Sequence, residues 1–146
     1  MSEYKSVLVA VDLTDDSAIV VDKARKLAKL YEADLSIVHV MEPVAVGMAV
    51  EVSSMDIESL HEEAAKYARE TLAEIGANID VPAHRLHNLI GQPAREIREL
   101  AKTLACDLVV MGGHGKHGLD LLLGSTSSGV AHGISCDLLI VRMPDH

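Results

Sequence analysis

Short apolar runs alternate with segments of helical period along this chain, and this alternation limits the folds open to it. Five runs have the length of a strand: Ser6–Asp12, Leu35–Met41, Val81–Leu89, Asp107–Met111 and Asp137–Arg142. The run from Ser6 is almost continuously apolar, as in parallel strands that are covered on both faces. The run from Val81 is weaker and contains Pro82, which favours a position at the edge of a sheet.

Four helices are predicted between these strands. The first follows Thr14–Ser17, which supplies helix caps and acidic first-turn residues, and its apolar face extends from Val20 to Tyr31. The second is long, from about Met55 to Ile75, and Gly76 is its predicted stop. Its apolar face is predicted to contain Ile57, Leu60, Ala64, Tyr67, Ala68, Thr71 and Ile75.

The remaining connections are shorter. Pro93 suits the first turn of a third helix that opens at Gly91, and a fourth helix, rich in small residues, is predicted from Gly124 to about Gly133. The segment Glu42–Ser54 has mixed character and is predicted to be a loop.

This order of elements predicts an α/β fold, an open doubly wound parallel sheet of five strands with helices on both faces. Parallel strands need crossover connections, which are nearly always right-handed. Ligands of such sheets bind beyond the carboxyl ends of the strands, where the strand order reverses. We expect one domain, residues 1–146, because the length suits it and no repeat or linker interrupts the pattern.

The charge and the cysteine content argue against several classes of function. A formal net charge of −9, from 22 acidic and 13 basic residues, disfavours nucleic acid or an anionic membrane surface as the main partner. No apolar run is long enough to span a bilayer, and the N-terminus lacks the pattern of a signal peptide. Two cysteines are too few for a disulfide framework, so Cys106 and Cys136 are interpreted as buried, reduced thiols of a cytoplasmic protein.

The glycine-rich segment from Gly112 to Thr126 carries the strongest functional signal. Glycines permit a close approach of the backbone to a ligand, and the start of a helix presents unpaired N–H groups to an anion. Lys116 lies between the glycines and is expected to reach a β- or γ-phosphate. Asp12, at the end of the first strand, is expected to contact a ribose hydroxyl or a phosphate-bound divalent metal. The segment is neither a Walker A loop nor a Rossmann fingerprint. The alternative is that the glycines only form tight turns and the hydroxyls only cap a helix.

No other group of side chains in the sequence predicts a metal site or a catalytic reaction. The pairs His114/His117 and His84/His87 lack the partners of a zinc site, so no protein-bound metal is expected. His39, in an apolar strand, is predicted to be a hydrogen-bonded core residue. No set of nucleophile, base and acid stands out, so no catalytic residue is assigned.

Several segments together resemble the universal stress protein family, in its small single-domain form, over nearly the whole chain. They are Val9–Asp12 with Ser17, Ile37–Val40, Gly91–Pro93 with Ile97, Asp107–Gly112, Gly115, Gly124–Thr126 and Cys136–Val141. The resemblance implies strand order 3-2-1-4-5 and a site for an adenine nucleotide: ATP, ADP or AMP, with Mg²⁺. It also implies a homodimer, commonly formed by pairing of the last strands, here Leu138–Val141.

The family's ATP-binding pattern, Gly-x2-Gly-x9-Gly-Ser/Thr, assigns residues on this chain. Its phosphate-loop positions correspond to Gly112, Gly115, Gly124, Ser125 and Thr126. The residues near adenine and ribose would be Ala10, Val11, Asp12, Val40 and Met111. Eight residues, rather than nine, separate Gly115 from Gly124. The resemblance therefore favours an ATP-binding stress-response or signalling module with an unknown protein partner. The alternatives are a nucleotide-independent family member that works through protein contacts and, third, a slow ATPase or nucleotidyl-transfer enzyme.

Overall fold

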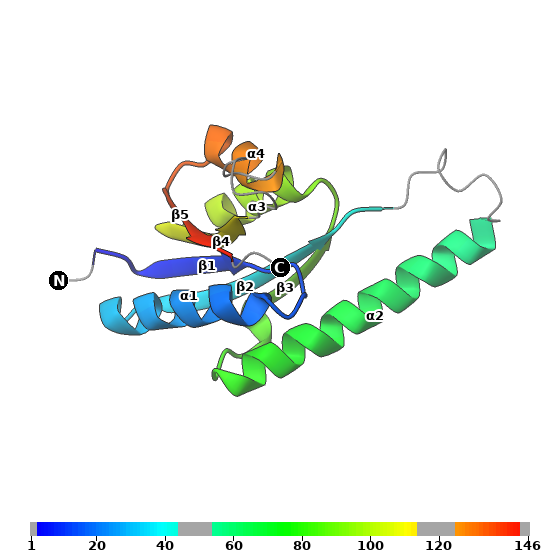
Figure 1. Ribbon diagram of the computed structural model, residues 1–146, viewed down its shortest axis with the longest axis horizontal. Coiled ribbons are helices and arrows are strands. Elements are labelled where there is room, and N and C mark those ends of the chain that lie inside the picture. The colour runs from blue at the N-terminus through cyan, green and yellow to red at the C-terminus, as the bar shows by residue number, and fades with distance from the viewer. Residues whose placement is uncertain (1–2, 44–53, 114–124, 144–146) are drawn as a thin grey trace.

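The computed structural model describes residues 3–43, 54–113 and 125–143. Strands and helices alternate along these ranges (Figure 1). In chain order they are β1 (Ser6–Ala10), α1 (Ser17–Tyr31), β2 (Asp34–Met41), α2 (Ser54–Asn78), the short 3-10 helix η2 (Ala83–Arg85), β3 (Leu86–Ile90), α3 (Pro93–Thr103), β4 (Leu108–Gly113), α4 (Ser125–Gly133) and β5 (Asp137–Arg142).

The strands form one parallel sheet in the order β3-β2-β1-β4-β5, which confirms the predicted fold class. Helices α1 and α2 lie on one face of the sheet, and α3 and α4 lie on the other (Figure 1). The chain moves outward from β1 to β3 and then crosses to β4 on the other side of β1. The strand order therefore reverses between β1 and β4, where a doubly wound sheet opens a crevice for ligands.

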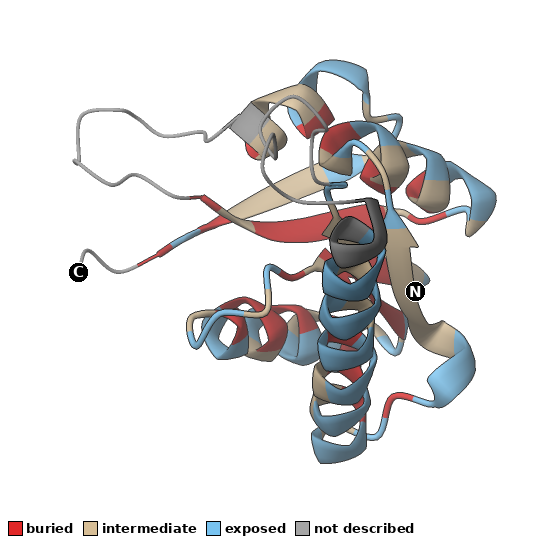
Figure 2. Cartoon of the chain, turned by 90° about the vertical axis from the view of Figure 1, so that its right-hand side faces the viewer, coloured by how far each residue is buried: buried red, intermediate tan, exposed pale blue. Residues whose placement is uncertain are grey.

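Alternate residues of each central strand belong to two different cores. Figure 2 shows buried residues both in the sheet and on the helices beside it. Val7 and Val9 of β1 face α1 and α2, while Leu8 between them faces α3 and α4, and all three are fully buried. A buried side chain of this size stabilises the fold by about 1.5–3 kcal/mol. Because the chain has no Phe or Trp, these aliphatic contacts form most of both cores.

The predicted ends of the first and fourth strands are wrong. β1 ends at Ala10 rather than Asp12, although the backbone N–H of Val11 still donates to the carbonyl of Val38 at 2.9 Å. β4 continues through Gly113, and Gly112 pairs with Val141 of β5. Gly112 is therefore a strand residue, and not part of a loop that follows the strand.

The predicted C-terminus of the second helix is also wrong. α2 continues past Gly76 to Asn78, and the left-handed residue that follows it is Asp80, with φ of 58°. Gly76 is buried, and a Cβ there would lie 3.0 Å from a methyl group of Leu86, so close packing accounts for this glycine. The predicted apolar face is only partly buried, since Leu60 is 50% exposed and Tyr67 is 59% exposed.

The third strand begins later than predicted, because η2 occupies Ala83–Arg85 and β3 starts at Leu86. Its position at the edge of the sheet is confirmed. The first turn of α1 contains no acidic residue, and Asp16 at its N-cap makes no side-chain capping bond. Pro93 does lie in the first turn of α3, where Gln92 Oε1 accepts from the backbone N–H of Arg95 at 2.6 Å.

Both cysteines are free thiols, but only Cys106 is buried, while Cys136 is half-buried. Burial raises the pKa of Cys136 to about 11, with smaller contributions from Cys106 and nearby carboxylates. Within the described ranges, no helix combines the length and the apolar character needed to cross a membrane.

Candidate functional site

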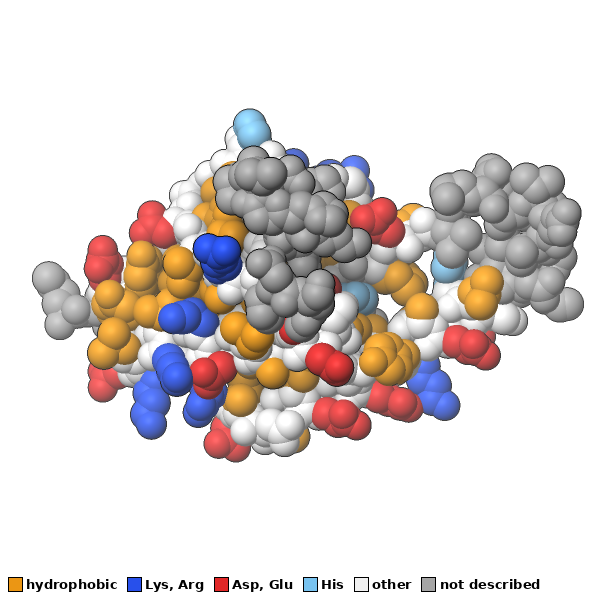
Figure 3. Space-filling model, in the orientation of Figure 1, with side chains coloured by type: hydrophobic (Ala, Val, Ile, Leu, Met, Phe, Trp, Pro, Cys, Tyr) orange, Lys and Arg blue, Asp and Glu red, His pale blue; other side chains and the backbone are white. Residues whose placement is uncertain are grey.

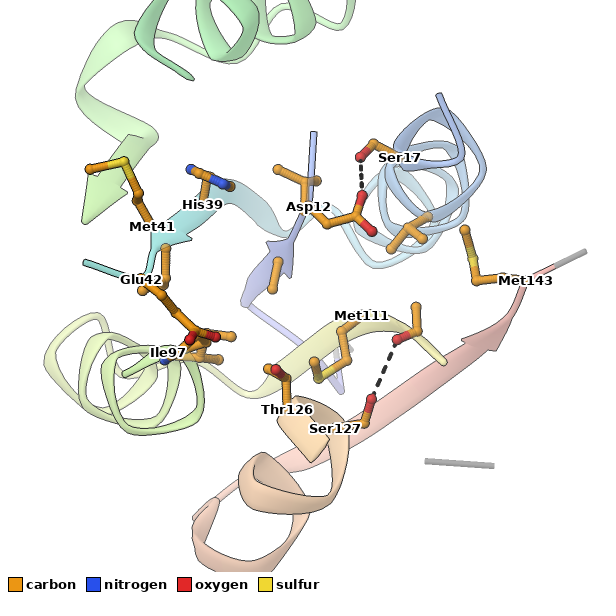
Figure 4. Close-up of a pocket in the computed structure, with 16 residues that line it drawn as sticks. Asp12, Ser17, His39, Met41, Glu42, Ile97, Met111, Thr126, Ser127 and Met143 are labelled. Carbon is orange, nitrogen blue, oxygen red and sulfur yellow. Dashed lines mark hydrogen bonds between the residues drawn. The ribbon is translucent and has the colours of Figure 1, made fainter. Parts of the chain in front are cut away.

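A pocket of about 540 Å³ opens at the carboxyl ends of β1, β2 and β4 (Figure 4). It lies at the reversal of strand order, between the first turn of α1 on one side and the first turns of α3 and α4 on the other. The fold opens this crevice because the helices that follow β1 and β4 leave on opposite faces of the sheet. The volume falls within the range of small-molecule sites, about 300–1,000 Å³.

The structure brings most of the predicted site residues to this pocket. Ala10, Val11, Asp12, Val40, Met111, Gly112 and Thr126 all line it. Ser125 is the first residue of α4, directly before Thr126. Gly115, Lys116 and Gly124 lie outside the described residues, as do His114 and His117.

Asp12 is fixed by the turn between β1 and α1. Its Oδ1 accepts hydrogen bonds from the backbone N–H and the hydroxyl of Thr14, at 3.1 and 2.7 Å, and from the hydroxyl of Ser17 at 3.0 Å. The next residue, Leu13, has a positive φ of 63°, which turns the chain sharply into α1. These bonds hold the carboxylate at the mouth of the pocket (Figure 4).

The first turn of α4 is joined to the sheet and to α3. Ser127 is 3% exposed, and its hydroxyl donates to the carbonyl of Gly112 at 3.4 Å (Figure 4). Further along α4, Arg98 of α3 donates to the carbonyl of Gly129 at 2.6 Å. The N-terminal end of α4, with Thr126 at the pocket, is thereby held over the carboxyl end of β4. Such a helix end attracts negative charge.

His39 is hydrogen-bonded, as predicted, but it is half-buried and lines the pocket, so its prediction as a core residue is wrong. Its Nδ1 lies 3.2 Å from Oδ1 of Asn88, and the amide of Asn88 donates to the carbonyl of Ala65 at 3.4 Å. The Asn88 oxygen is an acceptor in this arrangement, so we assign the proton of His39 to Nδ1. This chain of bonds joins the pocket wall to the middle of α2.

The described wall of the pocket has an acidic character. Asp12 and Glu42 are its carboxylates, and no Lys or Arg lies among the described residues that line it. A phosphate bound here needs backbone N–H donors, a divalent cation or both. Among the described residues, no cluster of three or more His, Cys, Asp or Glu side chains is arranged to hold a metal ion.

Nine residues that line the pocket were not predicted, although several are close in sequence to predicted ones. His39, Met41 and Glu42 flank the predicted Val40 at the end of β2, while Pro93 and Ile97 come from the first turns of α3. Met143 follows β5 beside Gly112, where a Cβ on Gly112 would lie 3.0 Å from its sulfur. The nine are Ser17, Val20, His39, Met41, Glu42, Pro93, Ile97, Ser127 and Met143.

Comparisons with known proteins agree with this fold. The model of the universal stress protein family matches residues 3–142. Two proteins of Coxiella burnetii, universal stress protein A homologs 1 and 2, are 39% and 36% identical to the chain. The first comparison covers 97% of this chain and 99% of the relative, and the second covers 98% of each.

Solved structures show the same architecture. The universal stress protein UspA from Lactobacillus plantarum superposes with a TM-score of 0.78 at 23% identity, covering 97% of this chain and all of that one. A universal stress protein in complex with cAMP superposes with a TM-score of 0.68 at 26% identity, covering 97% and 98% of the two chains. On the family match and the identities together, the chain belongs to the universal stress protein family.

Proposed function

We propose that this protein binds an adenine nucleotide in the pocket and acts as a cytoplasmic stress-response or signalling module. ATP with Mg²⁺ is the first candidate ligand, and ADP and AMP are the others. The observation that carries the proposal is the convergence of seven predicted residues, from separate parts of the chain, on one pocket at the reversal of strand order.

The pocket offers a different surface to each part of a nucleotide. Ala10, Val11, Val40 and Met111 form an apolar wall suited to a planar adenine ring. The fixed carboxylate of Asp12 suits a ribose hydroxyl, because a carboxylate is a strong acceptor. The first turn of α4 suits the phosphates. The relative in complex with cAMP supports an adenine nucleotide as the ligand class.

A second candidate is a family member that works without nucleotide, through protein contacts alone. Two observations favour it: the segment between Gly115 and Gly124 is one residue shorter than the ATP-binding pattern, and the described wall carries two carboxylates.

Hydrolysis or transfer of the nucleotide is the third candidate. We expect slow hydrolysis at most, since none of the described lining residues is a cation that would stabilise transferred charge.

Calorimetric titration of nucleotide-stripped protein with ATP and Mg²⁺ tests the proposal. We expect saturable binding of ATP, no comparable binding of GTP, and a rise in thermal stability with ATP concentration. Gly124→Val should abolish the binding. Thr126→Ala should weaken it severalfold, whereas Ser128→Ala, a matched change on the same helix away from the pocket, should not. Absence of both heat and thermal shift at millimolar ATP would contradict the proposal and favour the second candidate.

We also propose that the protein is a homodimer paired through β5. This strand is an edge of the sheet, and Leu138, Leu139 and Ile140 are only half-buried in the single chain. An apolar edge strand is a template for pairing with a second copy. Sedimentation as a monomer at micromolar concentration would contradict this assembly.

A further inference from the structure

A second cavity, distinct from the nucleotide pocket, lies between α1 and α2. Its volume is about 740 Å³, and it is lined by the turn before α1, the first part of α1, the second half of α2 and the residue that follows α2. Figure 1 shows both helices on the same side of the sheet, with the axes diverging away from this region. We call this cavity the α1–α2 groove.

The walls of the α1–α2 groove are partly apolar and partly accessible. Leu13, Val21, Ile75 and Ile79 contribute aliphatic surface, and Tyr67, which is 59% exposed, contributes an aromatic ring. An amphipathic ring of this kind is a common anchor in protein interfaces. Thr71 and Asn78 add uncharged hydrogen-bonding groups along α2.

The charged groups of the groove are mostly acidic. Asp15, Asp22, Glu70 and Glu74 line it, and Arg25 is the cation among its lining residues. Arg25 is already paired with Asp22 at 3.2 Å. Within the described part of the chain, Asp15, Glu70 and Glu74 form no ion pair. Figure 3 shows acidic side chains, with basic side chains among them, along the side of the molecule where α2 runs.

We propose that the α1–α2 groove binds a basic amphipathic segment of a partner protein, with apolar side chains between the helices and Lys or Arg against Asp15, Glu70 and Glu74. Charge complementarity selects this occupant, because three unpaired carboxylates around apolar walls disfavour an acidic or purely apolar partner. A second copy of this chain fits less well, since its net charge is −9.

The groove adjoins the proposed nucleotide site, because Ser17 lines both cavities. The proposal does not depend on nucleotide binding, so it is tested on nucleotide-free protein. The probe is a synthetic amphipathic helical peptide of leucine and lysine, and the control peptide has every lysine replaced by glutamate. Backbone amide shifts of isotope-labelled protein report where each peptide binds.

We expect the lysine peptide to shift amides of α1 and α2 around the groove and the glutamate peptide to shift none. The variant with both Glu70→Lys and Glu74→Lys should bind the lysine peptide about tenfold more weakly. The matched control carries Glu58→Lys and Glu62→Lys, which are exposed, have the same spacing on the same helix and do not line the groove. This control should keep the affinity within about twofold.

Three results would overturn the proposal: no binding of the lysine peptide, shifts centred away from the groove, or an equal loss of affinity in the two charge-reversal variants. The last result would mean that the peptide responds only to net charge. Ala18→Trp, which places a large side chain in the groove without changing charge, provides a further check. It should weaken peptide binding, and retained affinity would also overturn the proposal.

Discussion

The hydroxyl of Ser17 donates to the carboxylate of Asp12 at 3.0 Å and so ties the chain after β1 to the first turn of α1. Ser17 is 5% exposed, and a buried hydroxyl needs a partner inside the protein. The same carboxylate oxygen accepts two bonds from Thr14. Asp12 therefore shapes the turn on which the pocket depends, in addition to lining the pocket.

Removing this carboxylate should destabilise the fold. We expect Asp12→Ala to lower the free energy of unfolding by about 1–3 kcal/mol, because the Ser17 hydroxyl loses its acceptor. Asp12→Asn should lower the free energy of unfolding by less, since an amide oxygen can still accept the hydrogen bond from Ser17. Urea denaturation followed by circular dichroism measures both. Asp15→Ala, an exposed neighbour, should change stability by less than about 0.5 kcal/mol, and an equal loss in that variant would refute the role of the turn.

Much of the architecture could be predicted because the relevant signals are local. The continuous apolar run of β1 and the helical period from Val20 to Tyr31 each follow from which faces the element buries. Pro93 marks the start of α3 because its missing N–H costs nothing in a first turn. Asp12 and Val40, which the family resemblance assigned to one site, line one pocket because the carboxyl ends of neighbouring parallel strands lie together.

The wrong boundaries came from signals that tertiary contacts override. α1 and α2 are followed by the non-glycine residues Glu32 and Asp80 in left-handed conformation, so a glycine was an unreliable stop signal. Gly76 is required by its contact with Leu86, and Gly112 by its contact with Met143. Contacts between segments far apart in sequence leave no local pattern, which is also why Met143 was missed at the pocket.

The packing of α4 on α3 should tolerate no side chain at Gly129. A Cβ there would lie 2.7 Å from the Cβ of Ala94, which is 1% exposed. We expect Gly129→Ala to lower the free energy of unfolding by about 1–3 kcal/mol and to weaken ATP binding, because Thr126 and Ser127 move with α4. Thermal unfolding and calorimetry measure the two effects.

A double variant provides the control for this clash. Ala94→Gly removes the opposing methyl group, so its combination with Gly129→Ala should cost less than the sum of the two single changes. Additive losses of unfolding free energy would show that residues 94 and 129 are not in contact.

The pKa of Tyr4 should be well above its ordinary value. Its hydroxyl donates to Oδ2 of Asp137 at 2.8 Å, and this bond, with smaller effects of burial and nearby charge, raises the pKa from 10.0 to about 12. Because the folded-state pKa is raised, the stabilisation is complete below pH 10 and is lost as the pH rises through about 12. The carbon NMR signal of the Tyr4 ring follows this titration.

Asp137→Asn should return the Tyr4 titration toward its ordinary range. Asp34→Asn, which removes an exposed carboxylate paired with Arg85, should leave it unchanged. An unaltered Tyr4 titration in Asp137→Asn would rule out the hydrogen bond as the cause.

The acidic wall of the pocket should make nucleotide binding depend on Mg²⁺. Asp12 and Glu42 line the pocket, and no Lys or Arg among the described lining residues balances their negative charge. The two carboxylates would therefore repel the phosphates of ATP that carries no Mg²⁺. We expect Glu42→Gln to tighten binding of ATP without Mg²⁺ by about twofold to fivefold, and by less with Mg²⁺, because the cation already reduces the ligand's charge. Glu63→Gln, which removes an exposed charge of α2 away from the pocket, should have no such effect. Calorimetry with and without EDTA measures the difference, and an equal gain in affinity under both conditions would show that Glu42 does not act through the charge of the phosphates.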